Sequence, residues 1–278
     1  MASSNNPIKT NFVVLSGPRT GSSAIRLWLN SHSQIRCHDE VLHKTLDTPD
    51  AIKYFAQASF PNIDYDETNL GYTDNQETQH LLHAYLTNLY LNPKHSSPWS
   101  HFDERRKTYS HNNTFYSERA VGFKLMYYLL DSQLLRQWLS NNTVKILHLT
   151  RDNILKQYLS YLTAKESNLY HSVSETTKTK VTVETSNLIN VLDYLSKGTE
   201  KFHRQFDNEN YLRINYENFC EQPQALGTKI TNFLSVNDDE LLLPLTRKLN
   251  SDHVIDIVNN YDELIKSLDG SIYQNMIS

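Results

Sequence analysis

The sequence predicts an α/β protein with a mainly parallel sheet and helices on both faces. Short apolar runs, which are typical of buried strands, alternate with longer segments whose apolar residues recur at helical spacing. The 278 residues suffice for one sizeable core. Neither an internal repeat nor a linker interrupts the alternation. We therefore expect residues 1–278 to form a single domain.

The expected elements follow in chain order. The strands are Phe12–Leu15, Ser33–His38, Ala120–Met126, Val144–Leu149 and Tyr211–Ile214. The helices are Ser22–Asn30, Ala51–Phe60, Glu77–Leu91, Ser132–Ser140 with Asp131 as its N-cap, a helix to about Glu166 with Asn153 or Asp152 as its cap, Thr185–Phe206, Pro223–Leu234 and Tyr261–Leu268. Polar segments predict a flexible tail at 1–10 and mobile loops at 92–118 and 167–183.

Composition limits the classes of function. A net charge of −4 disfavours a general nucleic-acid binder. Two cysteines provide neither a disulfide framework nor a zinc cluster. The first residues lack the basic and apolar parts of a signal peptide, and no stretch has the roughly 20 apolar residues of a transmembrane segment. We therefore expect a cytoplasmic protein.

The most informative stretch is Phe12–Ser23, in which a buried strand, a tight loop and a helix N-terminus follow one another. This arrangement binds phosphate, because backbone N–H groups and the helix dipole both favour an anion. We expect the anion to be held by Arg19, Thr20, Gly21, Ser22 and Ser23. The sequence thus predicts a P-loop-like fold that binds a phosphorylated cofactor.

A P-loop that holds a nucleoside triphosphate with magnesium follows a different pattern. It has four residues between its glycines and a lysine after the second one. Here the loop between Gly17 and Gly21 is one residue short, and Ser22 stands in place of the lysine. The sequence therefore disfavours a kinase or another nucleotide-binding protein of that type, which stays as an alternative.

Five polar residues fall at or near the carboxyl ends of the predicted strands: Arg19, Glu40, Lys124, Arg151 and Tyr216. Ligands of parallel α/β sheets bind at this edge. The segments that carry these residues, together with Ser160, resemble the sulfotransferase superfamily over roughly residues 12–235. The likeness is greatest to a bacterial branch that includes the trehalose and nodulation-factor sulfotransferases. The spacing from Arg151 to Ser160 is one residue longer than in cytosolic animal-type members, which fits that branch.

The resemblance implies 3′-phosphoadenosine-5′-phosphosulfate (PAPS) as the sulfuryl donor, with adenosine-3′,5′-bisphosphate as product and no metal. By position, the loop Arg19–Ser23 matches the part that holds the 5′-phosphosulfate. Arg151 and Ser160 match the residues that hold the 3′-phosphate, and Tyr216 matches an adenosine contact. Guanidinium groups bind phosphate bidentately, so the residue types suit these roles.

The expected chemistry is an in-line displacement similar to phosphoryl transfer. Cytosolic members have a histidine base two residues after a lysine, but here Met126 takes that place after Lys124. In the trehalose-type branch the base is a glutamate that Glu40 matches. We expect Glu40 as the general base, Arg19 as the group that stabilises the leaving phosphate and Lys124 as a second cation. His38 and His43 flank Glu40 and are expected to bind substrate or to replace Glu40 as base.

The expected acceptor is a hydroxyl or an amine of a small molecule. A cyanobacterial natural product such as a guanidinium toxin, and hence secondary metabolism, is one option, and a carbohydrate or glycolipid is another. Dimers occur in this branch, so a homodimer is one expected state. Two further alternatives are a binding module without catalysis and a di-iron protein. The di-iron alternative rests on two Glu-x-x-His pairs, Glu40 with His43 and Glu200 with His203, and the α/β alternation contradicts it.

Overall fold

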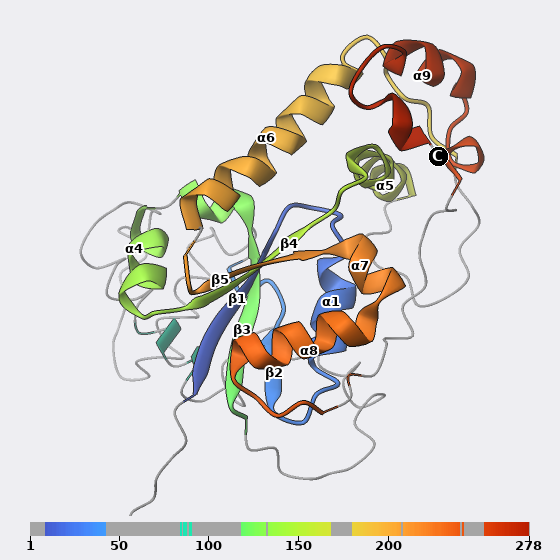
Figure 1. Cartoon of the computed structure of the whole chain (residues 1–278). Coiled ribbons are helices and arrows are strands. Elements are labelled where there is room, and N and C mark those ends of the chain that lie inside the picture. Colours follow the sequence, from blue (N-terminus) through green and yellow to red (C-terminus); the bar gives the residue numbers. More distant parts are fainter. Residues whose placement is uncertain are drawn as a thin grey trace, which may run out of the picture.

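A computed structural model describes residues 9–42, 84, 86–87, 89–90, 118–131, 133–167, 180–206, 208–239, 241 and 253–277. Five parallel strands form one sheet in the order β2-β3-β1-β4-β5 (Figure 1). They are β1 (Thr10–Ser16), β2 (Ile35–His38), β3 (Ala120–Met126), β4 (Lys145–Thr150) and β5 (Tyr211–Asn215). The predicted α/β fold with a parallel sheet is confirmed.

Strand β1 lies at the centre because it is apolar on both faces. Residues 12–15 are 0% exposed, as expected for a central strand of a sheet whose two faces are both covered. Its register places Val14 beside Lys124 of β3, and Leu15 beside His148 of β4. Two polar side chains are therefore held in the middle of the core, each on a neighbour of β1.

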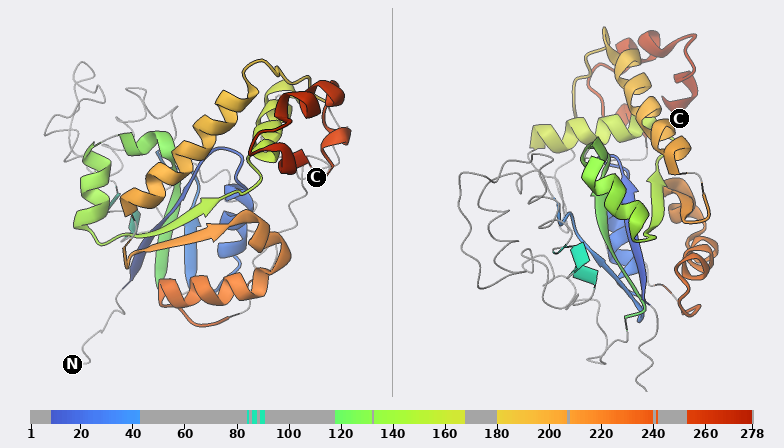
Figure 2. Two further views of the ribbon diagram at one scale, coloured as in Figure 1. Left: turned by 45° about the horizontal axis from the view of Figure 1, so that its top comes forward. Right: turned by 90° about the vertical axis from the view of Figure 1, so that its left-hand side faces the viewer.

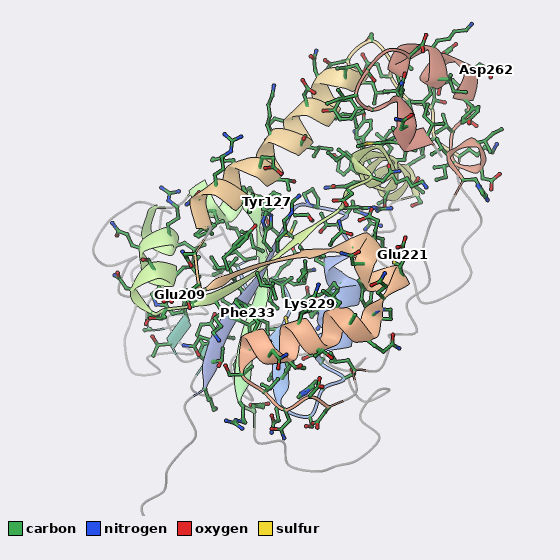
Figure 3. The ribbon with its side chains drawn as sticks, viewed as in Figure 1. Tyr127, Glu209, Glu221, Lys229, Phe233 and Asp262 are labelled. Carbon is green, nitrogen blue, oxygen red and sulfur yellow. The ribbon has the colours of Figure 1, made fainter. Side chains whose placement is uncertain are left out.

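Helices cover both faces of the sheet (Figures 1 and 2). One face carries α1 (Ser22–Leu29), α7 (Tyr216–Glu221) and α8 (Pro223–Leu234), packed through residues such as Trp28 and Phe219. The other face carries η4 (Tyr127–Asp131), α4 (Gln133–Asn141), the end of α6 (Leu188–Phe206) and helical residues between 84 and 90. Tyr127 and Phe233 mark these opposite faces (Figure 3).

A third apolar cluster lies beyond the carboxyl ends of the strands (Figure 1). It joins α5 (Ile154–Ser167), the start of α6, η5 (Val254–Asp256), α9 (Tyr261–Leu268) and η6 (Gln274–Ile277). Val181 pairs with Val258 in a parallel bridge at its centre, and both are buried. The C-terminal segment is therefore anchored to the helix that follows β4.

The sequence predicted most of these elements. All five strands occur within two residues of their expected ends, and Ala120–Met126, Pro223–Leu234 and Tyr261–Leu268 match the structure fully. Asp131, the predicted N-cap, is the last residue of η4; α4 is described from Gln133, and residue 132 lies outside the described residues. The short helix α7 was not predicted. Buried Val181 and Val183 belong to packed structure at the end of the segment expected to be a mobile loop.

Several predictions lie outside the described residues: the tail at 1–8, the helix Ala51–Phe60, most of Glu77–Leu91, and the loops at 92–117 and 168–179. Among the residues that the structure does describe, no helix combines the length and hydropathy of a membrane span.

Candidate active site

The loop between β1 and α1 is held by its carbonyl oxygens. Three of them accept hydrogen bonds from side chains: Gly17 from Thr20 (3.0 Å), Pro18 from Gln157 (2.8 Å) and Arg19 from Arg151 (3.2 Å). Arg19 adopts a left-handed backbone with φ of 61°. Such a conformation is uncommon for a residue with a side chain and is found mainly where the surroundings enforce it, often at functional sites. The conformation of the loop is thus fixed by side chains from α5 and the turn before it, as well as by its own sequence.

The N-terminus of α1 opens into this loop. Its N-cap is Gly21 with φ of 90°, no side chain caps it, and its first turn contains no acidic residue. A β-carbon on Gly21 would lie 2.3 Å from Cδ2 of Tyr216, so only glycine fits. The first N–H groups of a helix have no acceptor within the helix, and the dipole makes this end positive. The α1 terminus therefore suits an anion.

Three residues predicted to bind phosphate come together beside the loop. Nε of Arg19 donates to Oγ of Ser160 over 3.1 Å, and Arg151 reaches the Arg19 carbonyl. The guanidinium of Arg151 also lies over the Tyr216 ring, 4.9 Å from its centroid. Residues from the ends of β1, β4 and β5 thus meet at one edge of the sheet, as the sequence predicted.

Lys124 forms a second cluster with two carboxylates. Its side chain is only 2% exposed, so its charge requires partners. Nζ donates to Oε1 of Glu40 at 2.8 Å, to Oδ1 of Asp39 at 2.9 Å and to Oγ of Ser23 at 3.3 Å. Because Ser23 belongs to the first turn of α1, the lysine joins the anion loop to the acidic pair after β2.

Asp39 is a site residue that the sequence analysis missed. Its carboxylate contacts Lys124 and, at 3.4 Å, Nη2 of Arg26 on α1. Burial favours the neutral acid, but the ammonium of Lys124 and the guanidinium of Arg26 outweigh it and lower the pKa of Asp39 to about 2. Two adjacent acids at the end of a strand could have drawn attention to Asp39. Nothing in the sequence showed that Arg26 would reach it.

Replacing Asp39 with asparagine should destabilise the protein at neutral pH. The drop in pKa from 3.8 to about 2 corresponds to about 2 kcal/mol of stability. A lowered pKa stabilises the fold above the unfolded-state pKa, and this contribution is lost as the pH falls towards the folded-state value. Urea unfolding should show a constant difference between the proteins from pH 7 to about 5 that narrows below about pH 4. Asp262→Asn, at an exposed position on α9 (Figure 3), is the control, and equal effects of the two changes would contradict the ion pairs.

His38 and His43 differ from the expectation. His38 is buried at 4% exposure. Its neighbour Cys37 packs on the α1 face, so by strand alternation His38 points to the opposite face from Lys124. This placement does not favour a role as base for His38. His43 lies outside the described residues.

A buried polar column, formed by Tyr127, His148 and Tyr211, packs against the loop. His148, which is 0% exposed, contacts the hydroxyls of Tyr127 (2.5 Å) and Tyr211 (2.6 Å). Burial, together with nearby Arg213 and His203, lowers the pKa of His148 to about 3, so the imidazole is neutral. Cε2 of Tyr127 would be 3.1 Å from a β-carbon on Gly17, so the column ends against the loop. A histidine within an apolar run was the only sequence signal for it.

The di-iron alternative does not fit the structure. Glu200 pairs with Arg213 at 3.3 Å, and His203 contacts the Tyr211 hydroxyl at 3.1 Å. In the described part of the chain, no group of three or more histidine, cysteine or acidic residues could hold a metal ion. A parallel sheet also replaces the four-helix bundle that such a site requires.

Fold and site together define an α/β protein that presents the β1–α1 loop, three cations and a carboxylate pair at one sheet edge. The chain belongs to the sulfotransferase family, whose profile matches residues 11–240. The superfamily predicted from the sequence is thereby confirmed, and family membership supports sulfotransferase activity.

The chain also aligns with solved structures of low sequence identity. A sulfotransferase from Alicyclobacillus acidocaldarius has 14% identity, with 88% of this chain and 87% of that chain covered and a TM-score of 0.42. The sulfotransferase domain of the Synechococcus PCC 7002 olefin synthase has 17% identity, 99% and 88% coverage and a TM-score of 0.41. Mouse sulfotransferase SULT7A1, complexed with PAP, has 12% identity, 98% and 88% coverage and a TM-score of 0.41. No curated protein matches the chain.

Proposed function

We propose that the protein transfers a sulfuryl group from PAPS to a hydroxyl or amine of a small-molecule acceptor. The observation that carries this proposal is the meeting of an uncapped helix N-terminus with Arg19, Arg151 and Lys124 at one sheet edge. A donor with two separate phosphate-type groups requires such a set of cations. The absence of a lysine after Gly21 disfavours a nucleoside triphosphate with magnesium.

The residues present fit this donor. The loop Arg19–Ser23 would hold the 5′-phosphosulfate against the α1 terminus. Arg151 and Ser160 would hold the 3′-phosphate, and the partly buried Tyr216 beside Arg151 would contact the adenosine. The hydrogen bond between Arg19 and Ser160 supports this assignment, because it makes the two phosphate sites neighbours.

Each residue has a task in the transfer. When bound, PAPS supplies a sulfuryl group whose bond to the 5′-phosphate oxygen breaks as sulfur bonds to the acceptor. Glu40 takes the proton that the acceptor loses, and Lys124 orients the Glu40 carboxylate by donating a hydrogen bond to it. Arg19 balances the charge that develops on the leaving phosphate oxygen. Asp39, with its low pKa, stays an anion and secures Lys124.

Acidic groups at the site favour a polar or cationic acceptor. The side chains of Asp39 and Glu40 are 28% and 23% exposed, so both carboxylates reach solvent beside the expected point of transfer. A natural product that carries a guanidinium group suits this charge, and a carbohydrate hydroxyl is the alternative. We also propose a cytoplasmic location, since Cys37 and Cys220 form no disulfide.

Isothermal titration tests the proposed donor. The protein should bind adenosine-3′,5′-bisphosphate without magnesium, with a Kd of about 1 μM or lower as expected for a site with several charge-assisted contacts. ATP with magnesium should bind at least about 100-fold more weakly, because the loop lacks the lysine for the β- and γ-phosphates. Binding of ATP with magnesium but not of the bisphosphate would replace this proposal with a kinase-like function.

A further inference from the structure

The N-termini of α1 and α5 both lie at the carboxyl edge of the sheet, and they differ in whether an acceptor of the protein already occupies them. The α1 terminus has no side-chain cap, as described above. At α5, both oxygens of the Glu217 carboxylate are engaged: Oε2 accepts from the backbone N–H of Asp152 (3.1 Å) and Oε1 from that of Asn153 (3.2 Å). Oδ1 of Asn153 accepts from the N–H of Lys156 at 2.8 Å. The positive end of α5 is thus already occupied by the protein's own acceptors.

The local sequence explains why Glu217 reaches this turn. Asn215 ends β5 and caps α7, where its side chain accepts from the N–H of Asn218 at 3.0 Å. Asn215 is paired in register with Thr150, the last residue of β4. The first residues of α7 therefore lie beside the turn that follows β4. Tyr216 contacts the guanidinium of Arg151, and Glu217 accepts hydrogen bonds from the backbone of the two residues that follow Arg151.

We infer that Glu217 is a positioning residue for the 3′-phosphate site. It fixes the turn from which Arg151 projects, and it fills the N-terminus of α5 with an internal anion. The 3′-phosphate is then received by the side chains of Arg151 and Ser160, and not by the dipole of α5. This inference rests on the proposed function, because it assumes a ligand with a 3′-phosphate.

The electrostatics give the inference its direction. Glu217 is an anion close to a site for an anion, so its charge alone would weaken phosphate binding. Two charge-assisted hydrogen bonds from backbone donors strengthen phosphate binding instead. They hold the turn in its binding conformation, so no free energy is lost in ordering it when the ligand binds. If positioning dominates, removing the carboxylate lowers affinity. If repulsion dominates, removing it raises affinity.

Titration of variants separates these effects. Glu217→Ala should bind adenosine-3′,5′-bisphosphate about tenfold more weakly than the wild type, which is about 1.4 kcal/mol. Its affinity for adenosine-5′-monophosphate, which lacks the 3′-phosphate, should change by less than about twofold, because the α1 terminus is untouched. Glu217→Gln keeps one acceptor oxygen and should fall between the two proteins. Glu221→Ala, at an exposed glutamate at the far end of α7 (Figure 3), is the matched control.

A second background shows whether Glu217 acts through Arg151. In protein that already carries Arg151→Ala, the further change Glu217→Ala should not alter bisphosphate affinity, because the positioned group is absent. A persisting tenfold loss would indicate general destabilisation and overturn the inference, as would unchanged or higher affinity of Glu217→Ala. If the wild type itself does not bind the bisphosphate, the proposed function fails, and this inference fails with it. If the wild type binds and Glu217→Ala binds equally well, only this inference fails.

Discussion

Replacing Arg151 with alanine is expected to weaken the binding of adenosine-3′,5′-bisphosphate by about 100-fold, because a guanidinium–phosphate pair is lost. Adenosine-5′-monophosphate should lose only about threefold, since Arg151 acts on its site indirectly, through the Arg19 carbonyl and the Tyr216 ring. Isothermal titration of both nucleotides against both proteins measures the difference. The ratio of the two losses is the informative quantity, because general damage to the fold would weaken both nucleotides alike.

The control for this comparison is Arg204→Ala, which removes an exposed arginine near the end of α6. It should change neither affinity. Equal losses of both nucleotides in Arg151→Ala would mean that Arg151 serves the loop and not the 3′-phosphate. That result would move the 3′-phosphate site elsewhere and leave Ser160 without its proposed role.

The change Glu40→Gln should lower kcat by about 10²- to 10⁴-fold, which is the usual contribution of a general base. The amide oxygen can still accept the hydrogen bond from Lys124, so the local structure and bisphosphate affinity should be kept. The acceptor must first be found by mass spectrometry, in a screen of candidate compounds with labelled donor. The kcat for that acceptor is then measured for the wild type and for Glu40→Gln.

Titration of the same variant with the bisphosphate provides the internal control. A parallel loss of affinity and turnover would show that Glu40 organises the donor site and is not the base. Unchanged turnover would assign the base to another residue. Among the candidates from the sequence, His43 would then be tested first, because buried His38 points to the other face of the sheet.

The sequence predicted those parts of the site that depend on local pattern. Arg19 and Arg151 each come shortly after an apolar run, and Lys124 interrupts one. These three residues could therefore be recognised as site candidates without knowledge of their contacts. The contacts of Asp39, Arg26 and Glu217 depend on tertiary structure. The pairing of β2 with β3 decides which acid meets Lys124, and the pairing of β4 with β5 brings Glu217 to α5. No periodicity within a single segment encodes either pairing.

Helix α7 was missed for a related reason. Its six residues make less than two turns, which is too short for a helical pattern of apolar residues to repeat. The cap at Asn215 was the local signal, and asparagine is also common in turns. The elements on either side of it, β5 and α8, were by contrast placed to within one residue.

The contacts of Arg19 have a consequence for how donor fragments should bind. Arg19 makes two hydrogen bonds, through its carbonyl oxygen with Arg151 and through its side chain with Ser160. Both of these partners are assigned to the 3′-phosphate, whereas Arg19 is assigned to the 5′-phosphosulfate. Binding free energies of sites that share partners are not additive. The contributions of the two phosphates should therefore depend on each other. The affinity of a nucleotide that carries both phosphates should therefore differ from the sum of its halves, so the site responds to the span between the charges as well as to their number.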